Sequence, residues 1–574
     1  MRIAPDTVGA PDAAEWRGMA VGVNGIAGGP SGLGLGRLVL VLMSCLAAGC
    51  GGGGSAAPPS VTPPPVSGPT WTQGVYQPAS TFKDFCAVVR TGSDSQGRPF
   101  ADKAGSLAQE LFWLRSWTNE TYLWNTEVTD QNPASFTDRV AYFNVLKTNA
   151  TAASGKAKDR FHFTLSTADY LAQVTSAPEA SYGAEIKVFA SSPPRDVRVL
   201  YTAASTPASE LLGGRPKLAR GARILTVDGV DVVNGGATQA EIDTLNRGLF
   251  PKTSGESHTF TVLYADQTQR TVTLQSALLV EEPLNRQAVL TTPTGKVGYL
   301  LFNTFSPYSS EKALVDAMAS LKAEGVNDVV LDLRYNGGGL LAVASQLSYM
   351  IAGPTRTAGR IFERLQFNAA AGTTNPVTGG ANNATPFYST GLGFSVTNGA
   401  AIQSLSLPRV FILSTASTCS ASESVINGLR GIDVEVVLIG GTTCGKPYGF
   451  YPADNCGQTY FSIQFNGVNQ KGFGDYPDGF APANSSSAFV TKITGCSVAD
   501  DLSRDLGDPG EAMLAAALGY RSTGSCPVAP PSGQAPARVA DTGASIETSA
   551  RSSAAQILRS MRDLRMPTQT PGGS

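Results

Sequence analysis

Apolar residues fall at helical spacing early in the chain and at strand spacing farther on. Within residues 104–124, Leu107, Leu111, Leu114 and Trp117 lie three or four apart, which predicts a helix with one face against a core. From 181 to 280 the pattern changes to short β-type runs, and several such runs with a single helix predict a small β-rich module. The expected elements are strands at 184–190, 196–202, 222–232, 258–265 and 270–276, and a helix at 239–249.

Residues 281–526 alternate strand-like and helical patterns, which predicts an α/β domain. The run 327–334 has an apolar centre at 329–331 and is interpreted as a parallel strand buried on both faces. The segment 309–325 has an apolar face and ends at Gly325, so it is expected to be a helix. The other expected elements are strands at 295–305, 408–414 and 434–441, and a helix at 420–431.

The two ends of the chain have a different composition. The apolar run 38–48 is too short to span a bilayer, which needs about 20 helical residues, but it suits the core of a signal peptide. Gly49 and Cys50 follow, and then a Gly- and Pro-rich tether to residue 75. This ending resembles the lipobox of bacterial lipoproteins, with Cys50 acylated; an ordinary secretory signal is the alternative. The tail 527–574 is expected to be disordered, with a weak helical pattern at 554–564.

Composition narrows the classes of function. Charged residues are 15% of the chain and the net charge is −2, so no basic surface is expected to hold nucleic acid. The only two histidines, His162 and His258, exclude a histidine-rich metal site. Any hydrolytic chemistry is therefore expected to use another base.

The eight cysteines indicate disulfides, because the chain is expected to be exported. If Cys45 leaves with the signal and Cys50 carries the lipid, six cysteines and many connectivities remain. We expect Cys444 to pair with Cys456, since the two bracket a short loop. No paired CxxC or CxxH spacing supports a zinc site.

Two strand-to-loop junctions concentrate unusual residues. Three glycines, 337–339, follow the buried strand 327–334 and expose backbone amides; no Lys-Ser/Thr follows them, so a phosphate loop is excluded. The second junction leads into the helix at 420–431, where Ser420 lies at the helix N-terminus and Glu423 follows at capping-box spacing.

Ser420 and Lys446 are expected to meet at one edge of the sheet. The first and third elements of a strand–helix–strand unit lie side by side, and Lys446 follows the second strand. A lysine acts as a base when burial moves its pKa from about 10.4 towards 7–8. A capping serine and a solvated surface lysine are the alternative interpretation of the two residues taken singly.

Four segments together resemble the C-terminal processing peptidases, also called tail-specific proteases, which are serine proteases with a Ser/Lys dyad and an embedded PDZ domain. They are DLRYNGGG, TCSASES, GGTTCGKPYG and DLGDPGEAMLAAALGY, and the resemblance spans about residues 85–526. It implies an α/β, multidomain fold: a helical N-terminal region, a PDZ-like β-rich module and a β/α spiral (crotonase/Clp-like) protease core. It implies no metal and no cofactor.

The same resemblance implies residue roles. Ser420 matches the nucleophile and Lys446 the general base, while the amides of Gly338 or Gly339 and of Ala421 match the oxyanion hole. Glu423 or a polar residue after the lysine would orient the dyad. Two departures are Phe450, at a position where Gln is often found, and a Ser-to-Lys spacing one residue longer than expected. Cys419 as the nucleophile is disfavoured, because a Cys/His pair is hard to build from two histidines.

The segment GARILTVDGVDVVN resembles a PDZ hairpin. PDZ domains bind a peptide's C-terminal strand and capture its carboxylate on backbone amides. The matching loop would be 182–186, with Tyr182, Gly183 and Ile186 as peptide-binding residues. The alternative is a module that packs against the rest of the protein and binds no peptide.

These inferences predict an exported, lipid-anchored serine endopeptidase of the cell envelope, which cleaves polypeptides and recognises them by their C-terminal ends. The expected division is leader 1–50, linker 51–75, helical region 76–180, PDZ-like module 181–280, protease core 281–526 and tail 527–574. Two alternatives stay open: an inactive peptide- or ligand-binding protein of the same fold, and an enzyme for cell-wall or small acyl substrates.

Overall fold

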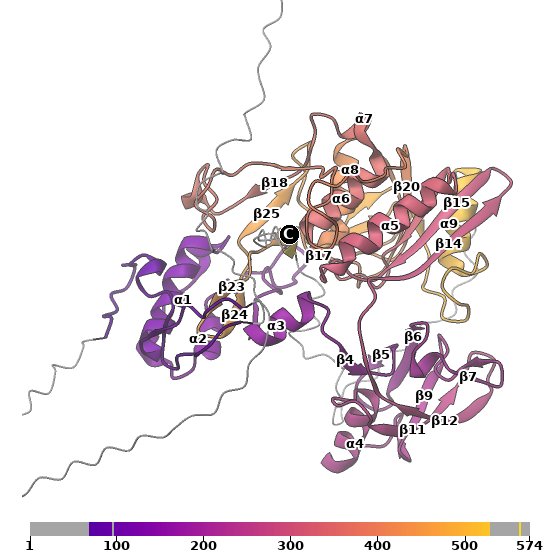
Figure 1. Ribbon diagram of the computed structural model, residues 1–574, viewed down its shortest axis with the longest axis horizontal. Helices are drawn as coiled ribbons and strands as arrows, with labels where there is room; N and C mark the ends of the chain where they lie inside the picture. The colour runs from indigo at the N-terminus through magenta and orange to yellow at the C-terminus, as the bar shows by residue number, and fades with distance from the viewer. Residues whose placement is uncertain (1–67, 95–96, 528–561, 564–574) are drawn as a thin grey trace, which may run out of the picture. The chain divides into compact units, whose positions relative to one another are not determined.

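The computed structural model describes residues 68–94, 97–527 and 562–563 (Figure 1). The expected leader, the lipid-bearing Cys50 and most of the linker and tail lie outside these residues and stay predictions. None of the described helices is long and apolar enough to cross a membrane.

The expected N-terminal helix is present as α1 (Leu107–Thr121). Ser106 caps it, because its hydroxyl accepts the N–H of Gln109 at 3.4 Å. Leu111, Leu114 and Trp117 are buried, as their spacing predicts. The other elements before residue 182 are η1 (Ala79–Thr81), β1 (Phe85–Cys86), β2 (Lys103–Ala104), η2 (Asn125–Glu127), η3 (Pro133–Ser135), α2 (Arg139–Val145), β3 (Phe163–Ser166), α3 (Thr167–Val174) and β4 (Glu179–Ser181).

The β-rich stretch has all the strands and the helix that the pattern predicts. Its main sheet has the order β12-β11-β9-β6-β5, with β10 beside β9. Helix α4 contributes Leu245 to a hydrophobic cluster with strand residues such as Val199, Ile224 and Phe260. The bounds are β5 (Ala184–Ala190), β6 (Asp196–Thr202), η4 (Pro207–Ser209), β7 (Leu211–Leu212), β8 (Arg215–Pro216), β9 (Arg223–Val227), β10 (Val230–Asp231), α4 (Gln239–Leu249), β11 (Ser257–Leu263), β12 (Gln269–Gln275) and β13 (Ala277–Leu279).

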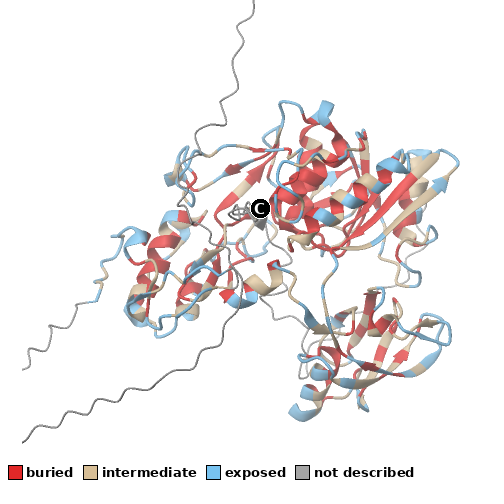
Figure 2. Ribbon diagram, in the orientation of Figure 1, coloured by how far each residue is buried: buried red, intermediate tan, exposed pale blue. Residues whose placement is uncertain are grey.

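A six-stranded sheet with the order β14-β15-β16-β20-β21-β28 forms the α/β core. The pair β14–β15 is antiparallel and the other pairs are parallel. Figure 2 shows its central strands buried, because helices and loops cover the sheet. The bounds are β14 (Leu284–Thr292), β15 (Gly295–Phe302), α5 (Ser309–Ala323), β16 (Asp328–Asp332), α6 (Leu341–Ala352), β20 (Arg409–Ser414), α8 (Ala421–Gly431), β21 (Glu435–Gly440), β28 (Gly495–Ser497) and α9 (Ala512–Thr523).

Smaller elements complete the described residues. Strand β17 pairs in parallel with β29, and the helix expected at 554–564 is wrong at 562–563, since these residues pair with a strand edge instead. Strand β24 pairs with β3 of the N-terminal region. The bounds are β17 (Gly339–Leu340), α7 (Pro354–Thr357), β18 (Ile361–Gln366), η5 (Ala369–Ala371), β19 (Thr385–Pro386), β22 (Tyr448–Gly449), β23 (Ala453–Asn455), β24 (Gln458–Phe461), β25 (Phe465–Val468), β26 (Phe480–Pro482), β27 (Thr491–Ile493) and β29 (Arg562–Asp563).

The disulfides differ from the expected pairing. The Cys444–Cys456 prediction is wrong: the bonds join Cys419 to Cys444, Cys86 to Cys456, and Cys496 to Cys526. Two extended strands, β22 and β23, separate Cys444 from Cys456. They carry Cys456 to the turn between β23 and β24, where it meets Cys86.

Candidate active site

Ser420 lies where strand β20 turns into helix α8. It is fully buried and has φ +59° and ψ −114°, a backbone conformation that is rare for residues with a side chain. Its hydroxyl has no hydrogen-bond partner among the residues that the structure describes. The junction therefore holds a strained serine with an uncommitted oxygen at the start of a helix.

Lys446 lies in the loop after β21, the strand that runs beside β20, as the strand–helix–strand pattern predicts. The residue is fully buried. Its Nζ lies 4.6 Å from the centre of the Phe161 ring and 4.7 Å from that of Phe450. Phe450, the departure noted in the sequence, thus gives the lysine an aromatic face. Phe161 comes from the N-terminal region, and no local pattern could have assigned it to the site.

Glu423 joins the main chains of the two residues. Its Oε2 accepts the Ser420 N–H at 3.0 Å and the Lys446 N–H at 2.8 Å. Its Oε1 accepts the Gly445 N–H at 2.9 Å and the hydroxyl of Thr443. Burial raises the pKa of Glu423, while the four donated hydrogen bonds act in the opposite direction. The carboxylate fixes the lysine loop on the first turn of α8.

The Cys419–Cys444 disulfide ties the same two segments together covalently. Cys419 directly precedes Ser420, and Cys444 lies in the loop that ends at Lys446. Because its sulfur is bonded, Cys419 is not a free thiol nucleophile in this structure. The sulfurs and the Glu423 carboxylate lie within 4.8 Å of one another, but a disulfide offers no thiolate to a metal.

Asn336 organises the glycine loop, a role that sequence reasoning missed. Its Oδ1 accepts the Gly338 N–H at 2.9 Å, and its carbonyl accepts the Cys419 N–H at 3.0 Å. The Gly338 amide, one of the expected oxyanion donors, is therefore already engaged. The Ala421 amide, at the first position of α8, has no acceptor among the described residues. At Gly339, φ is +133° and an added Cβ would lie 2.2 Å from the Ser306 nitrogen, so only glycine fits.

A buried ion-pair network supports the strand end behind the glycine loop, and it was also missed. Arg334 is fully buried and contacts Asp332 of β16 and Glu511, the N-cap of α9. Its Nη1 and Nη2 donate to the two Glu511 oxygens at 2.9 and 3.0 Å. Both residues stand in segments that carry the family resemblance, which was the available signal.

The histidines are engaged elsewhere. His162 stacks on Phe143, with ring centres 3.8 Å apart, and its Nε2 hydrogen-bonds the Phe143 carbonyl at 2.8 Å. Burial lowers the pKa of His162 to about 4. His258 pairs with Asp228 in the β-rich stretch, at 2.6 Å.

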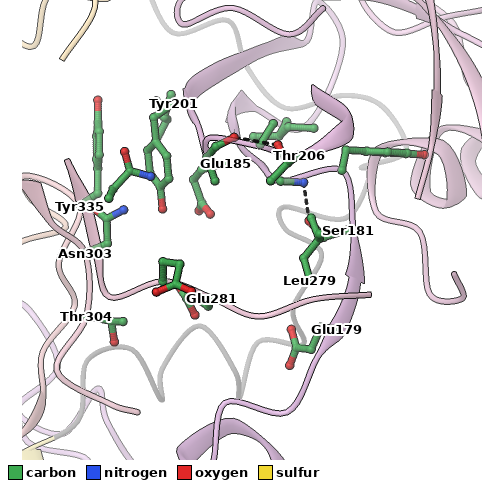
Figure 3. A pocket seen from close by; sticks show the side chains of 18 of the residues that line it. Glu179, Ser181, Glu185, Tyr201, Thr206, Leu279, Glu281, Asn303, Thr304 and Tyr335 are labelled. Carbon is green, nitrogen blue, oxygen red and sulfur yellow. Dashed lines mark hydrogen bonds between the residues drawn. The ribbon is translucent and has the colours of Figure 1, made fainter. Parts of the chain in front are cut away.

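The residues expected to form a peptide-binding loop line a cavity of about 620 Å³ (Figure 3). The Tyr182 hydroxyl donates to the Gly248 carbonyl at 3.0 Å, and the Gly183 N–H donates to Ser181 Oγ at 3.0 Å. The Ile186 side chain is buried. Across the cavity, the wall includes Gly337 and Cys419, next to Ser420 in sequence. The cavity therefore reaches Cys419, the residue before the serine, while Ser420 itself is not part of its lining.

Comparisons with known proteins fit this geometry. Residues 296–449 match the family model described as peptidase family S41. Among solved structures, a putative S41 protease from Bacteroides fragilis NCTC 9343 is similar, with a TM-score of 0.53 and 24% identity over 72% of this chain and 97% of that one. This likeness shows a shared fold.

Two further solved structures have lower TM-scores. The photosystem II D1 C-terminal processing protease has a TM-score of 0.38 and 19% identity over 68% of this chain and 94% of that one. Mature CPAF complexed with lactacystin has a TM-score of 0.32 and 14% identity over 65% of this chain and 92% of that one. A search of curated proteins found no match.

Proposed function

We propose that the protein is a serine endopeptidase of the tail-specific type, because residues 296–449 match the family model described as peptidase family S41. The observation that carries the proposal is the shared Glu423 oxygen, which holds Ser420 and Lys446 at one sheet edge. The unengaged, buried hydroxyl of Ser420 fits a nucleophile.

The proposed reaction passes through an acyl-enzyme. Neutral Lys446 takes the proton from Ser420 Oγ as this oxygen attacks the peptide carbonyl carbon. The amides of Ala421 and Gly339 hydrogen-bond the developing oxyanion, and each such donor contributes about 3–4 kcal/mol of barrier reduction. The lysine then gives its proton to the leaving amine. Water attacks the ester as Lys446 takes its proton. The bond to Ser420 Oγ then breaks, Lys446 returns the proton to this oxygen, and the acid product leaves.

Polypeptide is the substrate class that the surroundings favour. Strand β17 begins at Gly339 and already pairs with a short strand of the chain itself, β29. An edge that accepts a strand beside the serine suits an extended peptide better than a small acyl ester. We further propose that 181–280 is a PDZ-like module that guides substrates by their C-terminal ends, and that the chain is exported and anchored through lipid on Cys50.

The test uses the full-length protein and two readouts. A fluorophosphonate probe, which phosphonylates nucleophilic serines with loss of fluoride, is expected to label Ser420 in the wild-type protein and in neither Ser420→Ala nor Lys446→Ala. A fluorescently labelled unfolded protein should be hydrolysed at least about 10³-fold more slowly by Ser420→Ala, and about 10²–10⁴-fold more slowly by Lys446→Ala.

Ser522→Ala and Lys312→Ala, at exposed helix positions, serve as matched controls and should behave as wild type. A wild-type protein that neither reacts with the probe nor hydrolyses the unfolded protein would overturn the proposal. Such a result would favour the inactive peptide-binding alternative.

A further inference from the structure

The cavity beside Ser420 has a strongly one-sided charge. Among the described residues that line it are four glutamates and one basic residue, Lys187. Figure 3 shows Glu179, Glu185 and Glu281 around the opening. The fourth glutamate is Glu282. A cavity with this excess of carboxylates attracts cations.

An unsatisfied acceptor lies in the same wall. Asn303 is only 3% exposed, and its Oδ1 has no hydrogen-bond partner among the described residues. Figure 3 places the Asn303 side chain at the cavity, on the core side. A buried acceptor without a partner costs free energy, and a donor group on a ligand would remove that cost.

Two tyrosines also line the cavity. Tyr201 and Tyr335 stack on each other with their ring centres 5.7 Å apart. The Tyr335 hydroxyl already accepts a hydrogen bond from Arg220, so this ring is engaged within the protein. The carboxylates and the amide oxygen therefore carry the selection of a positively charged hydrogen-bond donor.

The polypeptide that already pairs beside the serine is basic. Strand β29 contains Arg562, and Arg559 and Arg565 flank it in the sequence. Its partner β17 starts two residues after Gly337, which lines the cavity. A strand that pairs with β17 therefore lies next to a segment that begins two residues from the cavity wall.

We propose that this cavity is a specificity pocket that binds arginine or lysine side chains of the polypeptide substrate. The inference rests on the proposed peptidase function and names its substrate class: extended segments rich in basic residues. It assigns Glu185 and Glu281 to charge recognition and Asn303 to acceptance of one N–H. Neutral and acidic segments are poor substrates.

Binding is tested separately from catalysis. Full-length Ser420→Ala protein is titrated with a fluorescein-labelled peptide that contains two arginines, and with the same peptide carrying citrulline, which keeps the shape and loses the charge. The arginine peptide should bind at least about tenfold more tightly, and its affinity should fall as salt rises. In Glu185→Gln/Glu281→Gln protein this preference should shrink to about twofold or less.

Two further variants test which residues recognise the arginine peptide. Glu210→Gln alters a glutamate of the same β-rich stretch that pairs with Lys217 outside the cavity, and it should keep the full preference. Asn303→Ala should weaken binding of the arginine peptide about threefold to tenfold, and binding of the citrulline peptide by a similar factor, because citrulline keeps N–H donors.

The outcomes separate the two proposals. Equal affinity for the two peptides, or a preference that survives the double substitution, overturns the specificity pocket. A charge preference in a wild-type protein that neither hydrolyses the arginine peptide nor reacts with the fluorophosphonate probe leaves the pocket in place and overturns the peptidase. Faster hydrolysis of the arginine peptide, with slower hydrolysis in the double variant, supports both.

Discussion

Ser420 and Lys446 donate their backbone N–H groups to the same oxygen, Glu423 Oε2, at 3.0 and 2.8 Å. The segments that carry the nucleophile and the base are therefore positioned through one buried atom. Neither segment can shift unless it breaks a charge-assisted hydrogen bond at a buried position, where water cannot replace it.

Glu423→Gln should disturb the junction although it preserves the side-chain shape. A glutamine has one acceptor oxygen, so its NH₂ group must face two N–H or O–H donors that the carboxylate now satisfies. We expect a loss of about 2–4 kcal/mol in the free energy of unfolding and a fall in probe labelling of Ser420 of at least tenfold. Urea unfolding and labelling rates check this, with the exposed Glu435→Gln as control.

Replacing the Cys419–Cys444 pair with serines should lower both stability and activity. The bond closes a loop with a sequence separation of 25 residues, for which chain entropy gives about 3 kcal/mol of stabilisation. We expect kcat to fall about tenfold, since the covalent tie between the lysine loop and the residue before Ser420 is then lost and only hydrogen bonds hold the loop. The double replacement of Cys496 and Cys526 is the matched control. Unchanged kcat in the Cys419/Cys444 variant would show that the disulfide does not position the dyad.

His162 should make the fold sensitive to acid. Its pKa is about 4 in the folded protein and about 6.5 in the unfolded chain, so the unfolded chain binds the proton more readily. The free energy of unfolding should therefore fall as pH drops from 6.5 to 4, by about 3 kcal/mol from this group. His162→Gln should lack this component, which urea unfolding at pH 7 and pH 4 measures. Equal pH dependence in the two proteins would contradict the assignment.

Shortening the tail should open the edge of β17. A chain that ends at Pro527 lacks β29, the strand that now pairs with β17 beside the serine. An intramolecular strand competes at an effective concentration of about millimolar, so its removal should raise kcat/KM for an unfolded protein about threefold to tenfold. A chain that ends at Asp563 keeps β29 and should match the full-length protein. Identical rates for both truncations would show that β29 does not compete with substrate.

Local patterns predicted most of the elements that build the site. The β20–α8–β21 unit has nearly the bounds that the sequence predicts. Its signals are two apolar runs and a capping serine, Ser420, and each depends only on residues close in sequence. The parallel pairing of its two strands brings Ser420 and Lys446 to one edge. Strand β14, in contrast, was not expected, since its residues are mostly half-buried and show no clear alternation.

Contacts between residues far apart in the chain could not be predicted from local sequence patterns. Phe161 contacts Lys446 across a large sequence separation, and Asn336 holds both the glycine loop and the Cys419 amide. The cysteine pairing failed for the same reason: closeness along the chain favoured Cys444 with Cys456, whereas the strands between them carry the two apart. Periodicity describes which face of an element is buried, not which distant element covers it.

The Cys86–Cys456 bond encloses nearly the whole folded chain in one covalent ring, with a sequence separation of 370. A cut at any one peptide bond inside that ring, including every loop of 181–280, releases no fragment. Such a nicked molecule migrates as a single species on a gel without reductant and separates into two pieces only after reduction. Self-cleavage or damage within the ring is therefore invisible to size-based assays unless the disulfide is first broken.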